Sequence, residues 1–151
     1  MSQALMLHRP YWTMMVRALT GVPVQEDNSG RFAASYFTAD PSPKITWLPN
    51  HCVGVLLHEA GHALDPETHE IARNLPCAWT DYDPDTVLRI EEKAWRIAAY
   101  LAQAFWPQLN DEIESWRIYG LEWYKRRLPH PPIPLLGVRW WAQERVKELR
   151  P

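Results

Sequence analysis

The stretch VGVLLHEAGHALD, residues 53–65, decides how the rest of the sequence is interpreted. Its first five residues are apolar, which predicts a buried helix, and His58 and His62 follow within the same run. Two side chains four positions apart project from one helix face, one turn apart, so the two imidazoles can share one metal ion. Glu59 lies beside His58, where a carboxylate can act as a general base toward a metal-bound water. The stretch therefore predicts a metal centre, and at least one further ligand must come from another part of the chain.

Chance is the alternative explanation of this pattern. The spacing HExxH arises in roughly one chain in a few hundred of this length, and an apolar helical context makes it rarer. Gly61 lies inside the motif although glycine costs about 1 kcal/mol relative to alanine in a helix. We therefore expect Gly61 to permit close packing against another element.

Three nearby residues are candidates for the missing ligand, and each has a drawback. Asp65 precedes Pro66, which disfavours a helical conformation at position 65, and Asp65 is better used to cap a new helix over residues 66–74. His69 would share the ligand face only if the first helix continued through Pro66. Cys52, six positions before the first histidine, would point away from that face.

A better candidate lies on a long helix predicted over residues 84–106. Glu91 falls within its apolar stripe, about 40° from Val87, whereas Glu92 falls about 140° away, where it can bridge to Arg96. A carboxylate on an apolar face is costly unless it is paired or bound to a metal. Glu91 is therefore the predicted third ligand, and pairing with a buried arginine or capping of a neighbouring element is the alternative. The stripe comprises Val87, Ile90, Ala94, Ile97, Ala98, Leu101 and Phe105.

With these residues identified, the chain resembles the gluzincin-type zinc metallopeptidases, in particular the ImmA/IrrE-type family and the minigluzincins. In that family a glutamate in the pattern E-x-x-A-N-x-F-A-A-x-L completes the HExxH site, and residues 91–101 read EEKAWRIAAYL. The resemblance covers about residues 30–105. It implies that His58, His62 and Glu91 bind Zn2+ and that Glu59 activates the zinc-bound water for hydrolysis of a peptide bond.

One departure from the family pattern concerns the second helix. Trp95 stands where the family usually has Asn or Asp, a residue expected to orient a histidine ligand through a hydrogen bond. The orientation must then come from another group, such as a backbone carbonyl.

The predicted fold class is α+β: a mostly helical, zincin-like domain with a small antiparallel sheet before the HExxH helix. Residues 31–37 and 44–48 read as a strand hairpin joined by turn-forming residues. The resemblance implies that 31–37 is an edge strand along which an extended polypeptide substrate pairs. We expect one domain over residues 1–151, with its core at about 30–105 and a helical extension at 108–151. Further helices are predicted at residues 10–20, 110–127 (interrupted at Gly120) and 138–149.

The composition narrows the possible partners. The net charge of −2 argues against a strongly charged partner, and the last 41 residues carry eight Lys and Arg against six Asp and Glu, so nucleic acid is not expected. No apolar run approaches the roughly 20 residues needed to cross a membrane, and no signal-peptide pattern begins the chain. Two cysteines without a CxxC pattern do not indicate a disulfide framework. We therefore expect a cytoplasmic protein without a membrane partner, whereas the sequence leaves the oligomeric state open.

The sequence leaves two further questions open. A donor that stabilises the transition state could be Tyr82, Tyr100, Tyr119, His69 or an arginine of the C-terminal segment, and the sequence does not choose among them. A non-catalytic zinc-binding module that acts by binding a partner protein is the alternative to an enzyme. A fourth protein ligand, such as His69 or Asp65, would favour that alternative.

Overall fold

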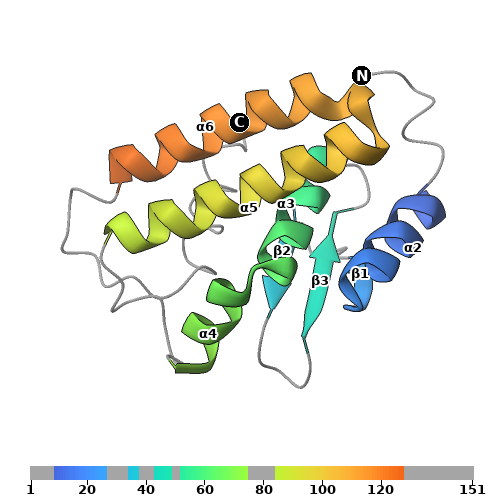
Figure 1. Cartoon of the computed structure of the whole chain (residues 1–151), viewed down its shortest axis with the longest axis horizontal. Coiled ribbons are helices and arrows are strands. Elements are labelled where there is room, and N and C mark those ends of the chain that lie inside the picture. The colour runs from blue at the N-terminus through green and yellow to red at the C-terminus, as the bar shows by residue number, and fades with distance from the viewer. Residues whose placement is uncertain (1–8, 27–33, 38–42, 49–51, 75–83, 128–151) are drawn as a thin grey trace.

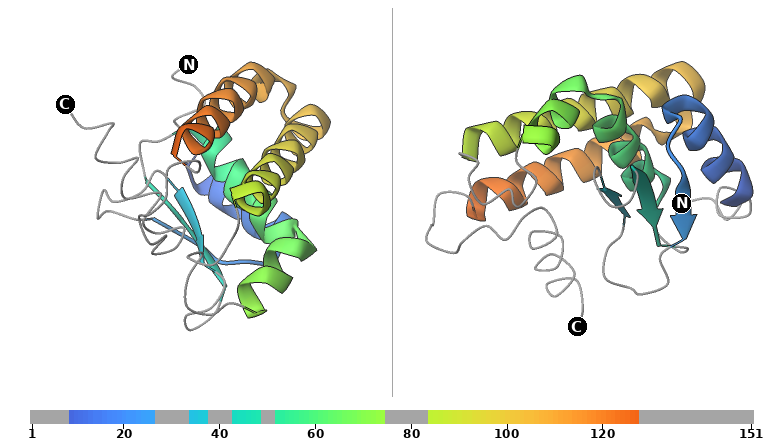
Figure 2. Two further views of the ribbon diagram at one scale, coloured as in Figure 1. Left: turned by 90° about the vertical axis from the view of Figure 1, so that its left-hand side faces the viewer. Right: turned by 90° about the horizontal axis from the view of Figure 1, so that it is seen from below.

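A computed structural model of the chain describes residues 9–26, 34–37, 43–48, 52–74 and 84–127. The elements form three layers: a small sheet, the central helix α3, and the pair α5 and α6 on the side of α3 away from the sheet (Figures 1 and 2). The predicted helix at 138–149 lies outside the described residues. In chain order the elements are α2 (Arg9–Thr20), β1 (Val24–Glu26), β2 (Ala34–Phe37), β3 (Lys44–Trp47), α3 (Val53–Leu64), α4 (Pro66–Asn74), α5 (Pro84–Phe105), the 3-10 turn η2 (Pro107–Leu109) and α6 (Asn110–Arg127).

The sheet is mixed, which corrects the prediction of an antiparallel sheet. Its strand order is β1-β3-β2; β2 and β3 pair in antiparallel fashion, and β1 pairs with β3 in parallel. The sequence analysis predicted no strand at residues 24–26, because these three residues show no apolar pattern. Val22 and Ile45 are buried beside this pairing, and Ile45 donates a backbone hydrogen bond to the carbonyl of Pro23 at 2.9 Å. Packing of the neighbouring residues therefore brings β1 into the sheet.

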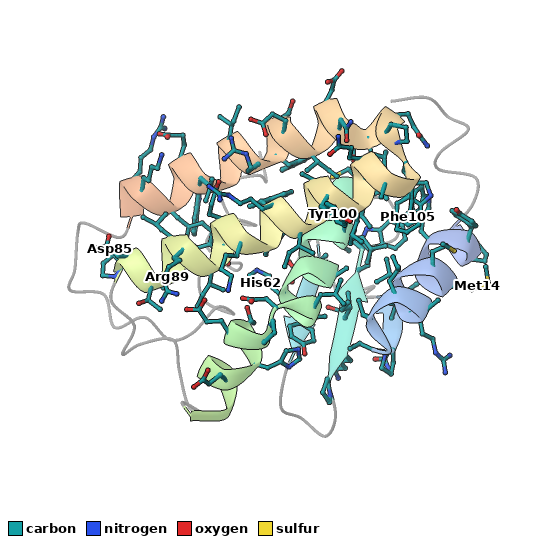
Figure 3. All side chains as sticks on the ribbon, in the orientation of Figure 1. Met14, His62, Asp85, Arg89, Tyr100 and Phe105 are labelled. Atoms are coloured by element: carbon teal, nitrogen blue, oxygen red, sulfur yellow. The ribbon has the colours of Figure 1, made fainter. Side chains whose placement is uncertain are left out.

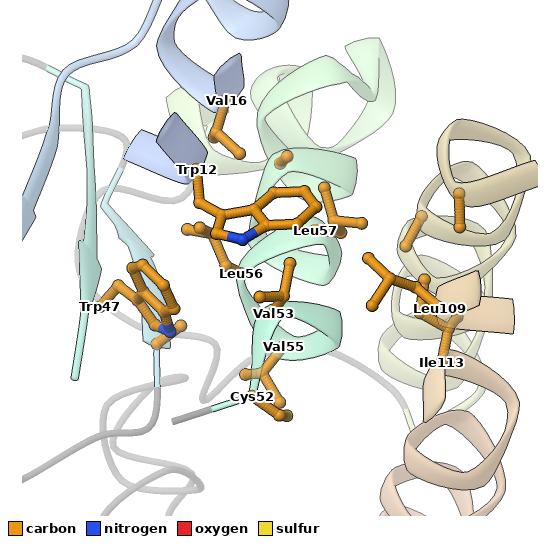
Figure 4. Close-up of a cluster of buried hydrophobic side chains, with 14 of the residues drawn as sticks. Trp12, Val16, Trp47, Cys52, Val53, Val55, Leu56, Leu57, Leu109 and Ile113 are labelled. Carbon is orange, nitrogen blue, oxygen red and sulfur yellow. The ribbon is translucent and has the colours of Figure 1, made fainter. Parts of the chain in front are cut away.

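Helix α3 lies at the centre of the core, and ten of its twelve residues are buried. A helix that is buried on nearly all sides must be apolar around most of its circumference, as the run before the first histidine is. Trp47 of β3 packs on the sheet side of α3 and Trp12 of α2 covers another face (Figure 4). Leu109 and Ile113 pack on the side opposite Trp47 (Figure 4). The predicted core and part of the predicted extension therefore share one hydrophobic cluster.

Helix α5 buries most of the predicted stripe, with one correction at its end. Phe105, expected on the buried face, is 56% exposed. It is the last residue of α5, about 16 Å along the axis from Ala94, where α5 crosses α3, so α3 does not reach it. The buried residues of α5 are Val87, Ile90, Glu91, Ala94, Trp95, Ala98, Leu101 and Ala102.

Two helix starts are stabilised by carboxylates. Asp65 accepts hydrogen bonds from the backbone N–H of Glu67 and of Thr68, so it caps α4 as predicted. The start of α3 is capped from another helix, because the backbone N–H of Gly54 donates to Glu112 of α6 at 2.8 Å. A carboxylate near a helix N-terminus also interacts favourably with the helix dipole.

Helix α6 runs without interruption through Gly120, which corrects the predicted break. Gly120 is buried, and Leu121 and Trp123 beside it are buried too. Tertiary packing therefore outweighs the low helix propensity of glycine at this position. Among the described residues, no helix is both long and apolar enough to cross a membrane.

Candidate metal centre

Two elements that are far apart in the sequence bring three buried side chains together. His58 and His62 project from α3, and Glu91 projects from α5 toward both of them. The Nε2 atom of His58 lies 3.1 Å from Oε2 of Glu91, and the Nε2 atom of His62 lies 3.3 Å from Oε1. The two Nε2 atoms lie 3.1 Å apart. Figure 3 shows His62 where α3 passes beneath α5.

A close crossing of the two helices makes this convergence possible. A Cβ atom at Gly61 would lie 2.3 Å from the carbonyl oxygen of Ala94, so the backbone of α5 occupies the space that a side chain would need. Gly61 precedes His62 by one residue, and Ala94 follows Glu91 by almost one helix turn. The close packing predicted for Gly61 is therefore confirmed, and it brings Glu91 within reach of the histidines.

The electrostatics of the three groups depend on one another. Burial by itself would lower the pKa of His62, but the charge and hydrogen bond of Glu91 outweigh burial and raise that pKa above 6.5. Burial by itself would raise the pKa of Glu91, but the charge of His62 and hydrogen bonds from both histidines lower it far below 4.5. Glu91 is therefore ionised over the whole physiological pH range and presents a carboxylate to the two imidazoles.

The spacing of the three donor atoms fits a small divalent cation. Ligand bonds of about 2.0–2.1 Å in tetrahedral geometry place neighbouring donor atoms about 3.3 Å apart. The observed separations of 3.1–3.3 Å match that edge length. Within the described part of the chain, His58, His62 and Glu91 form the one cluster of three or more histidine, cysteine or carboxylate side chains that could hold a metal ion.

The other predicted candidates lie elsewhere. Asp65 caps α4 and accepts a hydrogen bond from Lys93 at 2.8 Å, and this bond and those from Thr68 lower its pKa despite burial. Glu92 accepts hydrogen bonds from Arg96, as predicted, and from Arg117 of α6. Cys52 is buried at the N-cap of α3 and is not part of the cluster.

His69 is held by two contacts that keep it apart from the cluster. Its Nε2–H donates to the carbonyl of Ala63 at 2.7 Å, which leaves Nδ1 free to accept from the hydroxyl of Tyr36 at 3.3 Å. Burial raises the pKa of Tyr36, so its hydroxyl stays protonated and can donate. The sequence analysis did not single out Tyr36, because nothing in an alternating strand marks one aromatic residue as the partner of a histidine 33 positions away.

The remaining predicted residues differ in their surroundings. Glu59 is partly exposed on α3, and its negative charge helps to raise the pKa of His62. Tyr100 is 71% exposed; it is nine positions beyond Glu91, which places it on the opposite face of α5. Tyr119 is an exposed residue of α6, and Tyr82 lies outside the described residues.

Both histidine rings make aromatic contacts. The ring of His58 stacks on the indole of Trp95, with centroids 4.1 Å apart and planes 26° apart. The rings of His58 and His62 meet edge to face, with centroids 4.6 Å apart. Neither Nδ1 atom has a hydrogen-bond partner among the residues that the structure describes. The sequence analysis left open what orients the histidines in the absence of Asn or Asp at position 95. The structure shows that Trp95 itself is in direct contact with His58, a predicted ligand.

Comparisons of the chain with protein-family models, curated proteins and solved structures found no match.

Proposed function

We propose that the protein is a zinc-dependent metallopeptidase of the gluzincin type, with His58, His62 and Glu91 as the zinc ligands. The observation that carries the proposal is the convergence of two imidazoles and one ionised carboxylate in a buried site, with Glu59 beside the first histidine. Three protein ligands leave a fourth position for water or substrate, as in catalytic rather than structural zinc sites.

Each residue of the site has a defined role in this proposal. Zinc, when bound, acts as a Lewis acid and lowers the pKa of water to about 7. Glu59 accepts the proton of the water nucleophile and passes it to the leaving amine. Glu91 supplies the negative charge that the two neutral imidazoles lack. Burial of the ligands excludes bulk water, which strengthens every electrostatic interaction in the site.

A polypeptide substrate is proposed because the described sheet ends in a strand near the candidate metal centre. β2 is at the edge of the described sheet and contacts α3, the helix that carries both histidines. An extended chain can add to such an edge through backbone hydrogen bonds. The hydrogen bond between Tyr36 of β2 and His69 of α4 ties this edge to the helix that follows α3. A substrate paired with β2 would therefore lie along a strand of fixed position.

The ligand set can be tested with two neighbouring glutamates. Purified protein should contain about one zinc per chain by mass-spectrometric metal analysis. Glu91→Ala should lose the zinc because it removes a ligand. Glu92→Ala should retain it, because the described hydrogen bonds of Glu92 come from Arg96 of α5 and Arg117 of α6 and not from the histidines. Equal zinc contents in the two variants would show that Glu91 is not a ligand.

The enzymatic role can be tested separately. Glu59→Gln retains the shape of the side chain but removes the base, so it should bind zinc as the wild type does and lose cleavage of a denatured-protein or peptide library by at least about 100-fold. A wild-type protein that holds zinc and cleaves no member of the library would favour the non-catalytic zinc-binding interaction module.

A further inference from the structure

The stacking of His58 on Trp95 bears on how the histidine rings of the candidate metal centre are oriented. Trp95 is 2% exposed and lies four positions beyond Glu91, so both side chains project from the same face of α5 toward α3. Its indole covers the imidazole of His58 in a nearly parallel arrangement. One helix therefore supplies both a predicted ligand and the surface against which another predicted ligand rests.

Metal-binding histidines are normally oriented by a hydrogen bond from the ring nitrogen that does not bind the metal. At this centre the Nε2 atoms face Glu91, and the Nδ1 atoms of His58 and His62 have no such partner in the described ranges of the chain. An imidazole without that bond can rotate about its Cβ–Cγ bond unless neighbouring atoms prevent it. The orienting contact must therefore be of another kind.

A flat ring at 4.1 Å restricts this rotation sterically. Turning the imidazole out of its plane would drive its edge into the indole, whereas the observed plane keeps the two rings stacked. The negative face of an indole also attracts an imidazole whose positive charge increases on binding a cation. His62 then meets His58 edge to face, so the fixed plane of the first ring restricts the second.

We propose that Trp95 is the positioning residue of the metal centre. Its indole fixes the plane of His58 by stacking and, through His58, the plane of His62, in place of the hydrogen bonds that orient most histidine ligands. The proposal rests on the metal centre of the proposed function but not on peptidase activity. It predicts that metal affinity depends on the size of the flat surface at position 95.

The test compares zinc affinity, measured by competition with a chromophoric chelator, in four variants. Trp95→Phe, which retains a smaller ring, should bind zinc about 3- to 10-fold more weakly, and Trp95→Met, which retains volume without a flat face, about 10- to 100-fold more weakly. Trp12→Phe and Trp12→Met are the matched controls, because Trp12 is equally buried but meets Trp106 and Tyr11 instead of a histidine. The controls should bind zinc within about 2-fold of the wild type.

A second measurement separates positioning from general stability. The visible absorption of the cobalt-loaded protein reports ligand geometry, so it should change in Trp95→Met and stay unchanged in Trp12→Met at equal loading. If Trp95→Met is not obtained folded, the two phenylalanine variants decide, and equal affinities in them overturn the proposal. Equal losses at positions 95 and 12, or unchanged affinity at position 95, also overturn it. A wild type that binds no zinc would instead overturn the proposed function.

Discussion

Replacement of Gly61 by alanine tests whether the close crossing of α3 and α5 builds the metal centre. The new Cβ would lie 2.3 Å from the carbonyl oxygen of Ala94 and 2.9 Å from its Cα. Carbon and oxygen atoms normally approach no closer than about 3.3 Å, so the helices must separate by about 1 Å. Both Ala94 atoms belong to the backbone, so a change of side-chain rotamer cannot relieve the clash, and Ala94→Gly should not rescue the variant.

The displacement is large compared with the tolerance of a metal site. Ligands must be held within about 0.5 Å of the productive geometry, and a 1 Å separation would carry Glu91 beyond bonding distance of a metal held by the histidines. Zinc affinity should therefore fall by at least about 100-fold, roughly as in a variant that lacks the third ligand. Overpacking costs about 1–3 kcal/mol, and alanine regains up to about 1 kcal/mol of helix propensity. Because the clash involves backbone atoms, the overpacking cost should lie near the upper end of its range, so the expected net loss of unfolding free energy is about 2 kcal/mol.

The assay combines chelator competition for zinc with urea unfolding of the metal-free protein. Gly54→Ala is the matched control on the same helix, because its Cβ would lie 3.1 Å and 3.3 Å from side-chain atoms of Glu112 and Ile113, which can shift. The control should bind zinc normally and change stability by less than about 1 kcal/mol. If Gly61→Ala binds zinc within about 3-fold of the wild type and unfolds at the same urea concentration, the helix crossing does not determine the site.

Three further predictions follow from the described contacts. The raised pKa of His62 stabilises the metal-free protein below pH 6.5, and this contribution is lost as the pH rises through the raised pKa. The lowered pKa of Glu91 stabilises the protein above pH 4.5, and this contribution is lost as the pH falls through the lowered pKa. Since zinc needs neutral imidazoles, the rise in Tm on adding zinc should be larger at pH 8 than at pH 5.5, and the reverse order in calorimetry would contradict the ligand assignment. Glu112→Ala should destabilise the protein by about 1 kcal/mol in urea unfolding through loss of the acceptor at the start of α3. Glu114→Ala is the control, because it removes a neighbouring carboxylate that makes only an exposed ion pair with Arg117, and it should cost less than Glu112→Ala. Asp65→Ala should cost about 1–2 kcal/mol by removing the cap of α4 while zinc content stays unchanged; loss of zinc would implicate Asp65 as a ligand.

Several residues at the candidate metal centre could be identified from the sequence because they are unusual for their position in a helix. Glu91 is a charge on an apolar stripe, and helical periodicity alone placed it on the buried face of α5, where it meets both histidines. Asp65 and Pro66 end one helix and begin the next through local backbone preferences, which a short window of sequence contains. Gly61 could be identified because its presence in a helix is unfavourable without close packing.

Features that depend on distant parts of the chain could not be predicted. The parallel pairing of β1 joins residues about 20 positions apart, and three residues contain too little pattern to indicate a strand. Glu112 caps α3 across a separation of 58 positions. The sequence analysis read Trp95 as the loss of a hydrogen-bonding residue, because sequence spacing does not reveal which ring an indole will face.

Three consecutive residues of α5 also determine which of two adjacent glutamates can serve as a ligand. Glu91 faces the histidines, Glu92 accepts from Arg117 of α6 at 3.0 Å, and Lys93 donates to Asp65 at 2.8 Å. Successive side chains are 100° apart around the axis, so these contacts hold the helix from three directions. Turning α5 by one residue to present Glu92 in place of Glu91 would break both other contacts. The chain thus carries a second carboxylate next to its candidate metal centre, and the neighbouring ion pairs prevent this carboxylate from taking the place of Glu91.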